Sequence, residues 1–183
     1  MSLPTHQVVI DFWFQQTEPA SWFKPDAAFD ALLCERFGAL LDAARRCELS
    51  DWRGTPEGRL AEVIVLDQFP RNIHRGTPQA FASDALALVL AQEAVRAGDD
   101  QRLPTASHKA FLYMPYMHSE SAVVHQDALR LFDQPGLEEN HRFEVQHWRI
   151  IERFGRYPHR NAILGRASTE AELAFLQEPG SSF

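Results

Sequence analysis

Residues 55–72 read TPEGRLAEVIVLDQFPRN, and the order of residue types in this stretch is typical of one long helix. Thr55 is suited to cap the amino end of the helix, and Pro56 fits its first turn. Proline disfavours helical geometry in the residue before it, so we expect the helix to run to Phe69 and to stop at Pro70. The stretch therefore predicts a helix with defined ends in the first half of the chain.

Asp67 lies on the apolar face of this predicted helix. Leu60, Val63 and Ile64 define that face, and a seven-residue step from Leu60 returns to it. An unpaired carboxylate in a protein core is too costly to persist, so Asp67 must be paired, hydrogen-bonded or protonated there. Arg71, or an arginine from the C-terminal part of the chain, is the obvious partner. Both a structural ion pair and an acid in a pocket fit this pattern.

Helical spacing dominates the rest of the chain as well, and alternating strand patterns are scarce. A repeat of roughly 34 residues, as in tetratricopeptide proteins, does not recur. The predicted helices cover residues 5–15, 26–46, 55–69 and 82–97, a short turn within 105–113, the stretch from after Pro115 to 131, residues 138–154, the stretch from Pro158 to 164, and a last helix capped by Thr169 that ends before Pro179. We therefore predict an all-α protein of seven or eight helices in a single domain, residues 1–183, with a core of roughly residues 5–177.

The composition excludes several classes of protein. The 183 residues include 18 Lys and Arg against 25 Asp and Glu, a net charge of −7, so the chain lacks the basic character of a nucleic-acid binder. Its longest wholly apolar run, residues 85–91, is far shorter than the roughly 20 residues that span a bilayer. The first residues lack a signal-peptide pattern, and Cys34 and Cys47 are too few for a disulfide scaffold. We expect a soluble cytoplasmic protein without nucleic-acid or membrane partners.

Arginine is concentrated between residues 142 and 166. Six arginines lie there against two glutamates, although the chain as a whole is acidic. The guanidinium group is a planar fork that binds a carboxylate or a phosphate through two hydrogen bonds, which an ammonium group does not do. The concentration therefore predicts an anion site, unless these arginines pair with acids elsewhere in the chain.

Histidines occur on two further predicted helices. His147 lies in the apolar stripe of its helix, where it is either a satisfied core residue or a group for acid–base chemistry near neutral pH. On a second helix, His118 and His125 stack along one edge, seven residues apart. Glu120 and Asp127 stack along the other edge in the same way. The two rows either line a cleft or form the solvated shoulders of the helix.

The sequence contains no convincing metal or cofactor motif. Glu138 and Glu144 each precede a histidine by three residues, the spacing found in di-iron helical bundles. Both copies lie in one segment, six residues apart, so they cannot face each other as such a site requires. Motifs for zinc hydrolases, esterases, nucleotide hydrolases and dinucleotide binding are missing from the chain. We expect neither a metal nor a cofactor.

Two short segments of the chain echo each other. Residues 69–72 read FPRN and residues 157–161 read YPHRN, so each has an aromatic residue and a proline ahead of an Arg-Asn pair. Chance and a divergent duplication both account for so short a match.

Three motifs together resemble a known family. They read LDQFPRN at residues 66–72, PYMHSE at 115–120 and RFGRYPHRN at 153–161. In this combination the chain resembles the uncharacterised bacterial family named domain of unknown function 924, from about Val8 to Leu176. The resemblance implies an all-helical domain grouped with tetratricopeptide-like folds. It implies no reaction, and no catalytic role is transferred from it.

These observations favour a site for an anionic small molecule, with an acid–base function, in a cleft between helices. Asp67, His118 or Glu120 would act as the acid or base. The candidate ligand-binding residues are Arg71, Asn72, His147, Arg153, Arg156, His159, Arg160 and Asn161. The alternative is a tetratricopeptide-like module that binds a peptide in an open groove, with exposed aromatic residues such as Trp22 or Tyr116 and with the polar motifs buried as supports. No pattern predicts the oligomeric state.

Overall fold

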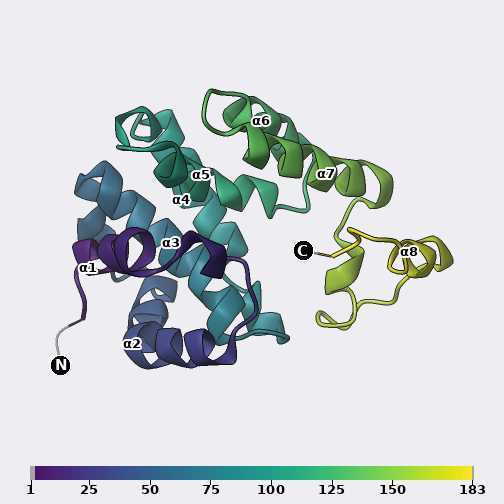
Figure 1. The fold of residues 1–183 in the computed structure, drawn as a ribbon, viewed down its shortest axis with the longest axis horizontal. Coiled ribbons are helices and arrows are strands. Elements are labelled where there is room, and N and C mark those ends of the chain that lie inside the picture. The colour runs from purple at the N-terminus through teal and green to yellow at the C-terminus, as the bar shows by residue number, and fades with distance from the viewer. Residues whose placement is uncertain (1–2, 183) are drawn as a thin grey trace.

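Every regular element between residues 3 and 182, the residues that the computed structural model describes, is a helix (Figure 1). The α-helices are α1 (His6–Asp11), α2 (Ala27–Arg45), α3 (Pro56–Ile73), α4 (Asp84–Arg96), α5 (Ala106–Met117), α6 (Ala122–Phe132), α7 (Glu138–Phe154) and α8 (Glu170–Phe175). Turns of tighter 3₁₀ helix occupy Pro19–Ser21, Ser50–Gly54, Pro78–Ala80, Asp100–Arg102 and Pro158–Arg160, and a π-helical turn at Phe12–Gln16 continues α1. None of these helices is both long and apolar enough to cross a membrane. The predicted all-α class is confirmed for the residues described.

Helix α3 is the central element of the N-terminal part of the molecule and packs against α1, α2, α4 and α5 (Figure 1). The Thr55 hydroxyl caps it by accepting a hydrogen bond from the Gly58 amide at 3.1 Å. Residues 60–70 are buried without exception, as expected for a helix with neighbours on all sides. Asp67 is therefore buried together with the apolar residues of the core, as its position in the sequence predicts.

Two prolines predicted to end or break helices lie inside them. Helix α3 passes Pro70 and ends at Ile73, and α5 passes Pro115 and ends at Met117. A proline inside a helix removes one backbone hydrogen bond, and its ring crowds the carbonyl group four residues earlier. Both prolines are buried in the last turn of their helices, and the carbonyl group of Pro70 still accepts a hydrogen bond from the His74 amide at 2.9 Å. Tertiary packing outweighs the local preference, so the predicted stops at the two prolines are wrong.

The chain leaves helical geometry between α5 and α6, where the sequence pattern predicts one continuous helix. His118 follows the last residue of α5, and the Ser119 hydroxyl accepts a hydrogen bond from the Ser121 amide at 3.2 Å. Serine turns of this kind compete with helix formation. His118 and His125 therefore lie on different elements, and the prediction that they stack along one helix edge is wrong. The same holds for the predicted row of acids on the other edge.

The C-terminal part of the chain turns back toward the end of α5. Helices α6 and α7 pack against each other, and Gly155 follows α7 in the left-handed conformation, with a φ of 68°. The next segment forms a 3₁₀ turn at residues 158–160 rather than the helix predicted up to residue 164. A small hydrophobic cluster supports it, formed by Ile150, Ile151, Tyr157 and Phe175. This turn brings Arg160 to the first residue of α4.

Candidate functional site

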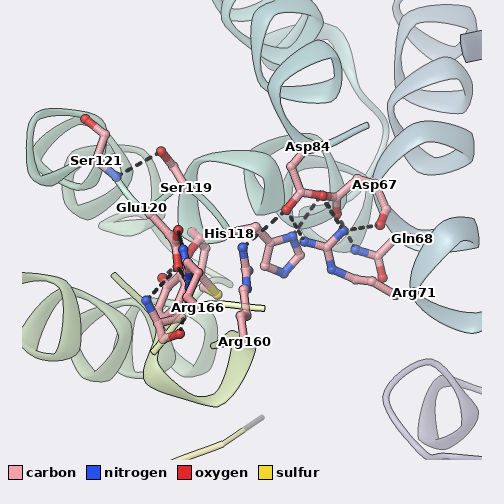
Figure 2. Close-up of polar contacts among 12 residues, drawn as sticks. Asp67, Gln68, Arg71, Asp84, His118, Ser119, Glu120, Ser121, Arg160 and Arg166 are labelled. Atoms are coloured by element: carbon pink, nitrogen blue, oxygen red, sulfur yellow. Dashed lines mark hydrogen bonds and ion pairs between the residues drawn. The ribbon is translucent and has the colours of Figure 1, made fainter. Parts of the chain in front are cut away.

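Four separate stretches of the chain bring polar side chains to one place (Figure 2). Asp67 and Arg71 come from the last turns of α3, and Asp84 is the first residue of α4. His118 comes from the end of α5, and Arg160 comes from the 3₁₀ turn after α7. We call these five residues the polar cluster. It joins residues 155–169, which lie between α7 and α8 and which we call the C-terminal segment, to the ends of three helices.

Asp67 and His118 form a hydrogen-bonded pair in the polar cluster, with 2.8 Å between Oδ1 of Asp67 and Nδ1 of His118. The Asp67 side chain is fully buried, and its Oδ2 atom accepts a hydrogen bond from the Gln68 side-chain amide at 2.5 Å. The Arg71 guanidinium lies 3.4 Å from the same carboxylate. Burial works against ionisation of Asp67, but Arg71 and His118 outweigh it, and the pKa of Asp67 lies well below its ordinary value. Asp67 is therefore a buried, paired carboxylate.

The protonation of His118 follows from its partners. Burial and the nearby Arg71 guanidinium lower the pKa of His118, and Asp67 offsets only part of this effect. The imidazole is therefore neutral at neutral pH and carries one hydrogen. An ionised carboxylate only accepts hydrogen bonds, so this hydrogen lies on Nδ1 and is donated to Asp67. The Nε2 atom keeps its lone pair, which is the state of a general base.

Asp84 bridges the two arginines of the polar cluster. The two terminal nitrogens of Arg71 donate to its two carboxylate oxygens, each at 2.9 Å. On the other side, Nη1 of Arg160 reaches the Asp84 carboxylate at 3.4 Å (Figure 2). Arg71 and Arg160 are the arginines of the two echoing motifs at residues 69–72 and 157–161. The two motifs thus meet at one carboxylate.

Arg160 is a buried cation with few acceptors. Its exposed fraction is 5%, and its guanidinium carbon lies 4.6 Å from the ring centres of both Phe81 and Tyr157. Its Nε atom has no hydrogen-bond partner within residues 3–182, and its contact with Asp84 is long. Burial and the neighbouring Arg71 lower the pKa of Arg160. The Nε atom is shut off from solvent, so the terminal nitrogens of Arg160 are the donors that a further anion can reach, in a plane fixed by two aromatic rings.

A cavity of about 370 Å³ lies beside the polar cluster. Its polar wall consists of Asp84, His118, Ser119, Glu120 and Arg160. Its apolar wall consists of Pro78, Phe81, Ala82, Ala85, Leu88, Pro115 and Leu164. Asp67 and Arg71 do not line the cavity, but they contact His118 and Asp84, which do. The cavity is thus formed by the start of α4 and the stretch before it, the end of α5 with the turn that follows, and the segment after α7.

Glu120 anchors the C-terminal segment beside the cavity. Its carboxylate accepts two hydrogen bonds from Arg166, at 2.6 and 2.9 Å, and one from the Tyr157 amide at 2.7 Å. Burial works against ionisation of Glu120, but the bonds from Arg166 and Tyr157 outweigh it and lower its pKa. Asn161 accepts a further hydrogen bond from Arg166 at 3.0 Å. These contacts hold the carboxylate of Glu120 in its charged form.

Two of the predicted ligand-binding arginines lie away from the cavity. Arg156 donates two hydrogen bonds to Glu172, at 2.6 and 2.8 Å, and so ties α8 to the segment after α7. The Arg153 guanidinium lies over the rings of Phe154 and Phe175, at 4.7 and 5.6 Å from their centres. Both side chains stabilise the C-terminal segment.

The remaining candidates are engaged near the site without lining the cavity. His147 donates from Nδ1 to the Phe143 carbonyl at 2.8 Å, and burial lowers its pKa to about 3. Burial likewise lowers the pKa of His159 to about 4, so both rings are neutral at neutral pH. Asn72 donates to the backbone of Gln68 at 3.2 Å.

Asp84 and Arg166 belong to this site, but the sequence does not single them out as site residues. An acid in the first turn of a helix is ordinary because it favours the helix dipole, so Asp84 carries no signal of its own. Arg166 is one of six clustered arginines. The echo between the two Arg-Asn motifs is the one sequence signal that points to Asp84. If the two arginines lie at one place, an acid is needed between them.

The aromatic residues expected along an open peptide groove are not on the surface. Tyr116 is 3% exposed. Trp22 is partly buried, donates from its indole nitrogen to the Trp13 carbonyl at 3.0 Å, and packs against Phe111. Tyr116 belongs to the hydrophobic core, and Trp22 packs against it.

Comparisons with known proteins identify the family of this chain. The chain belongs to the family described as bacterial protein of unknown function (DUF924), whose model matches residues 9–180. It is similar to the solved structure of a protein of unknown function from Agrobacterium tumefaciens, with 40% sequence identity and a TM-score of 0.89, over 94% of this chain and 96% of that chain. No protein with a curated description matches it. The predicted family is therefore confirmed, and any function has to be argued from the site itself.

Proposed function

We propose that the protein binds a small anion in this cavity and that His118 is the acid–base group of the site, which takes up a proton as the anion binds. The observation that carries the proposal is the presence of two groups on one cavity wall. Arg160 is a buried cation whose side chain makes one long hydrogen bond within residues 3–182, from Nη1 to Asp84, and His118 is an imidazole whose Nε2 atom keeps its lone pair. No comparable observation favours a tetratricopeptide-like module that binds peptides.

The anion is expected at Arg160. Burying a charged group is costly unless acceptors surround it, and within residues 3–182 the Arg160 side chain has one hydrogen-bond acceptor, the Asp84 carboxylate that it shares with Arg71. A carboxylate or phosphate in the cavity supplies the missing acceptor. The rings of Phe81 and Tyr157 keep the guanidinium plane in place, so little side-chain entropy is lost when the anion binds.

The charge balance of the site links anion binding to a proton. The site holds as many carboxylates as guanidinium groups, so their charges cancel. The carboxylates are Asp67, Asp84 and Glu120, and the guanidinium groups are Arg71, Arg160 and Arg166. An added anion gives the site a net negative charge, which raises the pKa of His118 and favours its protonation. Asp67 then stabilises the imidazolium and holds its orientation, as the carboxylate of a catalytic His–Asp pair does. His118 is thus the proposed acid or base, and Asp67 its positioning residue.

Removal of the Arg160 charge tests the proposal. We expect propionate, benzoate or inorganic phosphate to raise the melting temperature of the wild-type protein, because the bound anion stabilises the folded state. Arg160→Met keeps an apolar side chain between the two rings, and the affinity for that anion should fall at least about tenfold, as expected for the loss of charge-assisted hydrogen bonds. Thermal-shift titration followed by calorimetry measures both.

Arg153→Met is the matched control, because Arg153 also stacks on aromatic rings but lies away from the cavity. It should bind the anion like the wild type. The proposal is wrong if no such anion stabilises the wild type, or if Arg160→Met binds the anion as tightly as the wild type does.

A further inference from the structure

The two walls of the cavity differ in chemistry, and this difference points to a ligand class. The polar wall holds Arg160 and His118, and the apolar wall is formed by the start of α4, the stretch before it from Pro78 to Ala82, Pro115 and Leu164. Resting on the proposed function, we propose that the ligand is a monocarboxylate with an apolar tail. Its carboxylate binds at Arg160 and His118, and its tail covers the apolar wall.

The apolar wall is a surface that a hydrocarbon chain can cover. Ala85 and Leu88 lie three residues apart on α4, so they share one face of the helix, and Leu164 comes from the C-terminal segment. Leu88 and Leu164 are only partly buried, so this wall exposes apolar area to water. Each methylene group that covers such area is expected to tighten binding about fourfold.

The volume of the cavity indicates how long a tail it can cover. A water molecule takes up about 30 Å³ in the liquid, so 370 Å³ corresponds to about a dozen water-sized groups. A straight-chain carboxylate of about eight carbons fits within this volume. Acetate or propionate would fill only its polar end.

The charges on the polar wall favour one negative charge rather than two. Asp84 and Glu120 both line the cavity, and each already takes two hydrogen bonds from an arginine, Arg71 or Arg166. Arg160, whose terminal nitrogens make only the long contact with Asp84 within the described residues, is therefore the cation of this wall that can donate to a ligand. A phosphate monoester, with a charge of about −1.5 to −2 at neutral pH, would bring a second charge close to these carboxylates.

Calorimetric titration with acetate, butyrate, hexanoate and octanoate tests the inference on the full-length protein. The affinity should rise about fourfold per methylene group from butyrate to octanoate. Hexyl phosphate and 1-hexanol should each bind at least about tenfold more weakly than hexanoate. Hexyl phosphate carries more than one negative charge, and 1-hexanol carries no charge.

The variant Leu88→Gln separates the tail from the head group. It should flatten the dependence on chain length and leave the affinity for butyrate within about twofold of the wild type, because glutamine fills similar space but is polar. Val89→Gln is the matched control, since Val89 is the next residue of α4, is 52% exposed and does not line the cavity. It should show the wild-type dependence.

The outcomes distinguish this inference from the proposed function. If all four carboxylates bind equally and in an Arg160-dependent manner, the apolar-tail inference is overturned and the anion site stands. Tighter binding of hexyl phosphate than of hexanoate overturns the preference for one charge. If neither the carboxylates nor the phosphates bind, the proposed function fails together with the inference.

Discussion

Two buried carboxylates each hold a histidine through its Nδ1 atom, yet the two histidines differ in their surroundings. His118 binds Asp67 at 2.8 Å, and His125 binds Glu144 at 2.6 Å. The side chains of His125 and Glu144 are completely buried between α6 and α7. The His118 side chain is 15% exposed and lines the cavity. The two pairs therefore combine similar residues in different environments.

The second ring nitrogen accounts for the difference between the pairs. Nε2 of His125 donates to the Ser119 carbonyl at 2.8 Å and lies 3.2 Å from the Tyr157 hydroxyl. The ring thus fixes the turn between α5 and α6 against α7, and both of its nitrogens are used. His118, in contrast, lines the cavity, and its Nε2 atom keeps a lone pair. Access to the second nitrogen, rather than the presence of a His–carboxylate pair, separates a histidine with both nitrogens bonded inside the fold from one that can accept a proton at the cavity.

The largest expected effect on stability comes from His125→Ala. The change removes a ring from a closed space and leaves the Glu144 side chain and the Ser119 carbonyl group without their hydrogen-bond partner, so we expect the free energy of unfolding to fall by about 3–5 kcal/mol. His118→Ala should cost less, about 1–2 kcal/mol, because Asp67 keeps Gln68 and Arg71 and water can enter from the cavity. Urea unfolding of both variants measures the difference. Equal losses would show that the two histidines play the same structural role.

The two carboxylates respond to pH with opposite signs. For Asp67, burial is outweighed by Arg71 and His118, so its pKa is lowered, whereas burial raises the pKa of Glu144 and His125 offsets only part of that effect. The stability that Asp67 contributes is present above its unfolded pKa of about 3.9 and is lost as the pH falls through the lower, folded value. The contribution of Glu144 is present below its unfolded pKa of about 4.3 and is lost as the pH rises through the raised, folded value.

Replacing each of the two acids by its amide tests this difference in pH dependence. At pH 7, Asp67→Asn should lower the free energy of unfolding by about 1.5–3 kcal/mol, because Arg71 and His118 lose a charged partner. Glu144→Gln should leave it unchanged or raise it, since glutamine is neutral and resembles the protonated acid. Unfolding free energies measured from about pH 2 to pH 8 give both slopes, the Asp67 slope below about pH 4 and the Glu144 slope above it. A loss of similar size in the two variants at pH 7 would contradict the opposite signs.

The fold and part of the site follow from local sequence patterns. The cap at Thr55 and the seven-residue step from Leu60 to Asp67 are local, so they predict α3 and the burial of its carboxylate correctly. The predicted stop at Pro70 fails because burial among neighbouring helices outweighs one lost hydrogen bond. Local propensity does not contain that information.

The partners in the site are set by contacts over long sequence distances. His118 and its partner Asp67 are 51 residues apart in the sequence, and Arg160 and Asp84 are 76 residues apart. A serine turn of three residues, 119–121, decides that the two predicted stacked histidines take different roles. The sequence therefore indicates residue types for an acid–base site, whereas their pairing depends on how the C-terminal segment returns to α4 and α5.

The smallest expected effect on stability comes from His118→Asn. The asparagine amide can donate to Asp67 from nearly the position of Nδ1, so we expect the free energy of unfolding to change by less than about 1 kcal/mol. His125→Asn should cost more, because the amide does not replace the bond from Nε2 to the Ser119 carbonyl. Stability alone would then make His118 appear dispensable.

Proton uptake on binding gives His118→Asn its diagnostic value. In the wild type, the heat of binding of the best anion at pH 7 should differ between buffers of different ionisation enthalpy, because His118 takes up a proton as the anion binds. In His118→Asn the heat should be the same in every buffer, although the anion still binds at Arg160. His125→Asn, which leaves His118 intact, should keep the buffer dependence. If instead His118→Asn kept it, the proton acceptor would be another group, and the two histidine pairs would differ only in burial and not in chemistry.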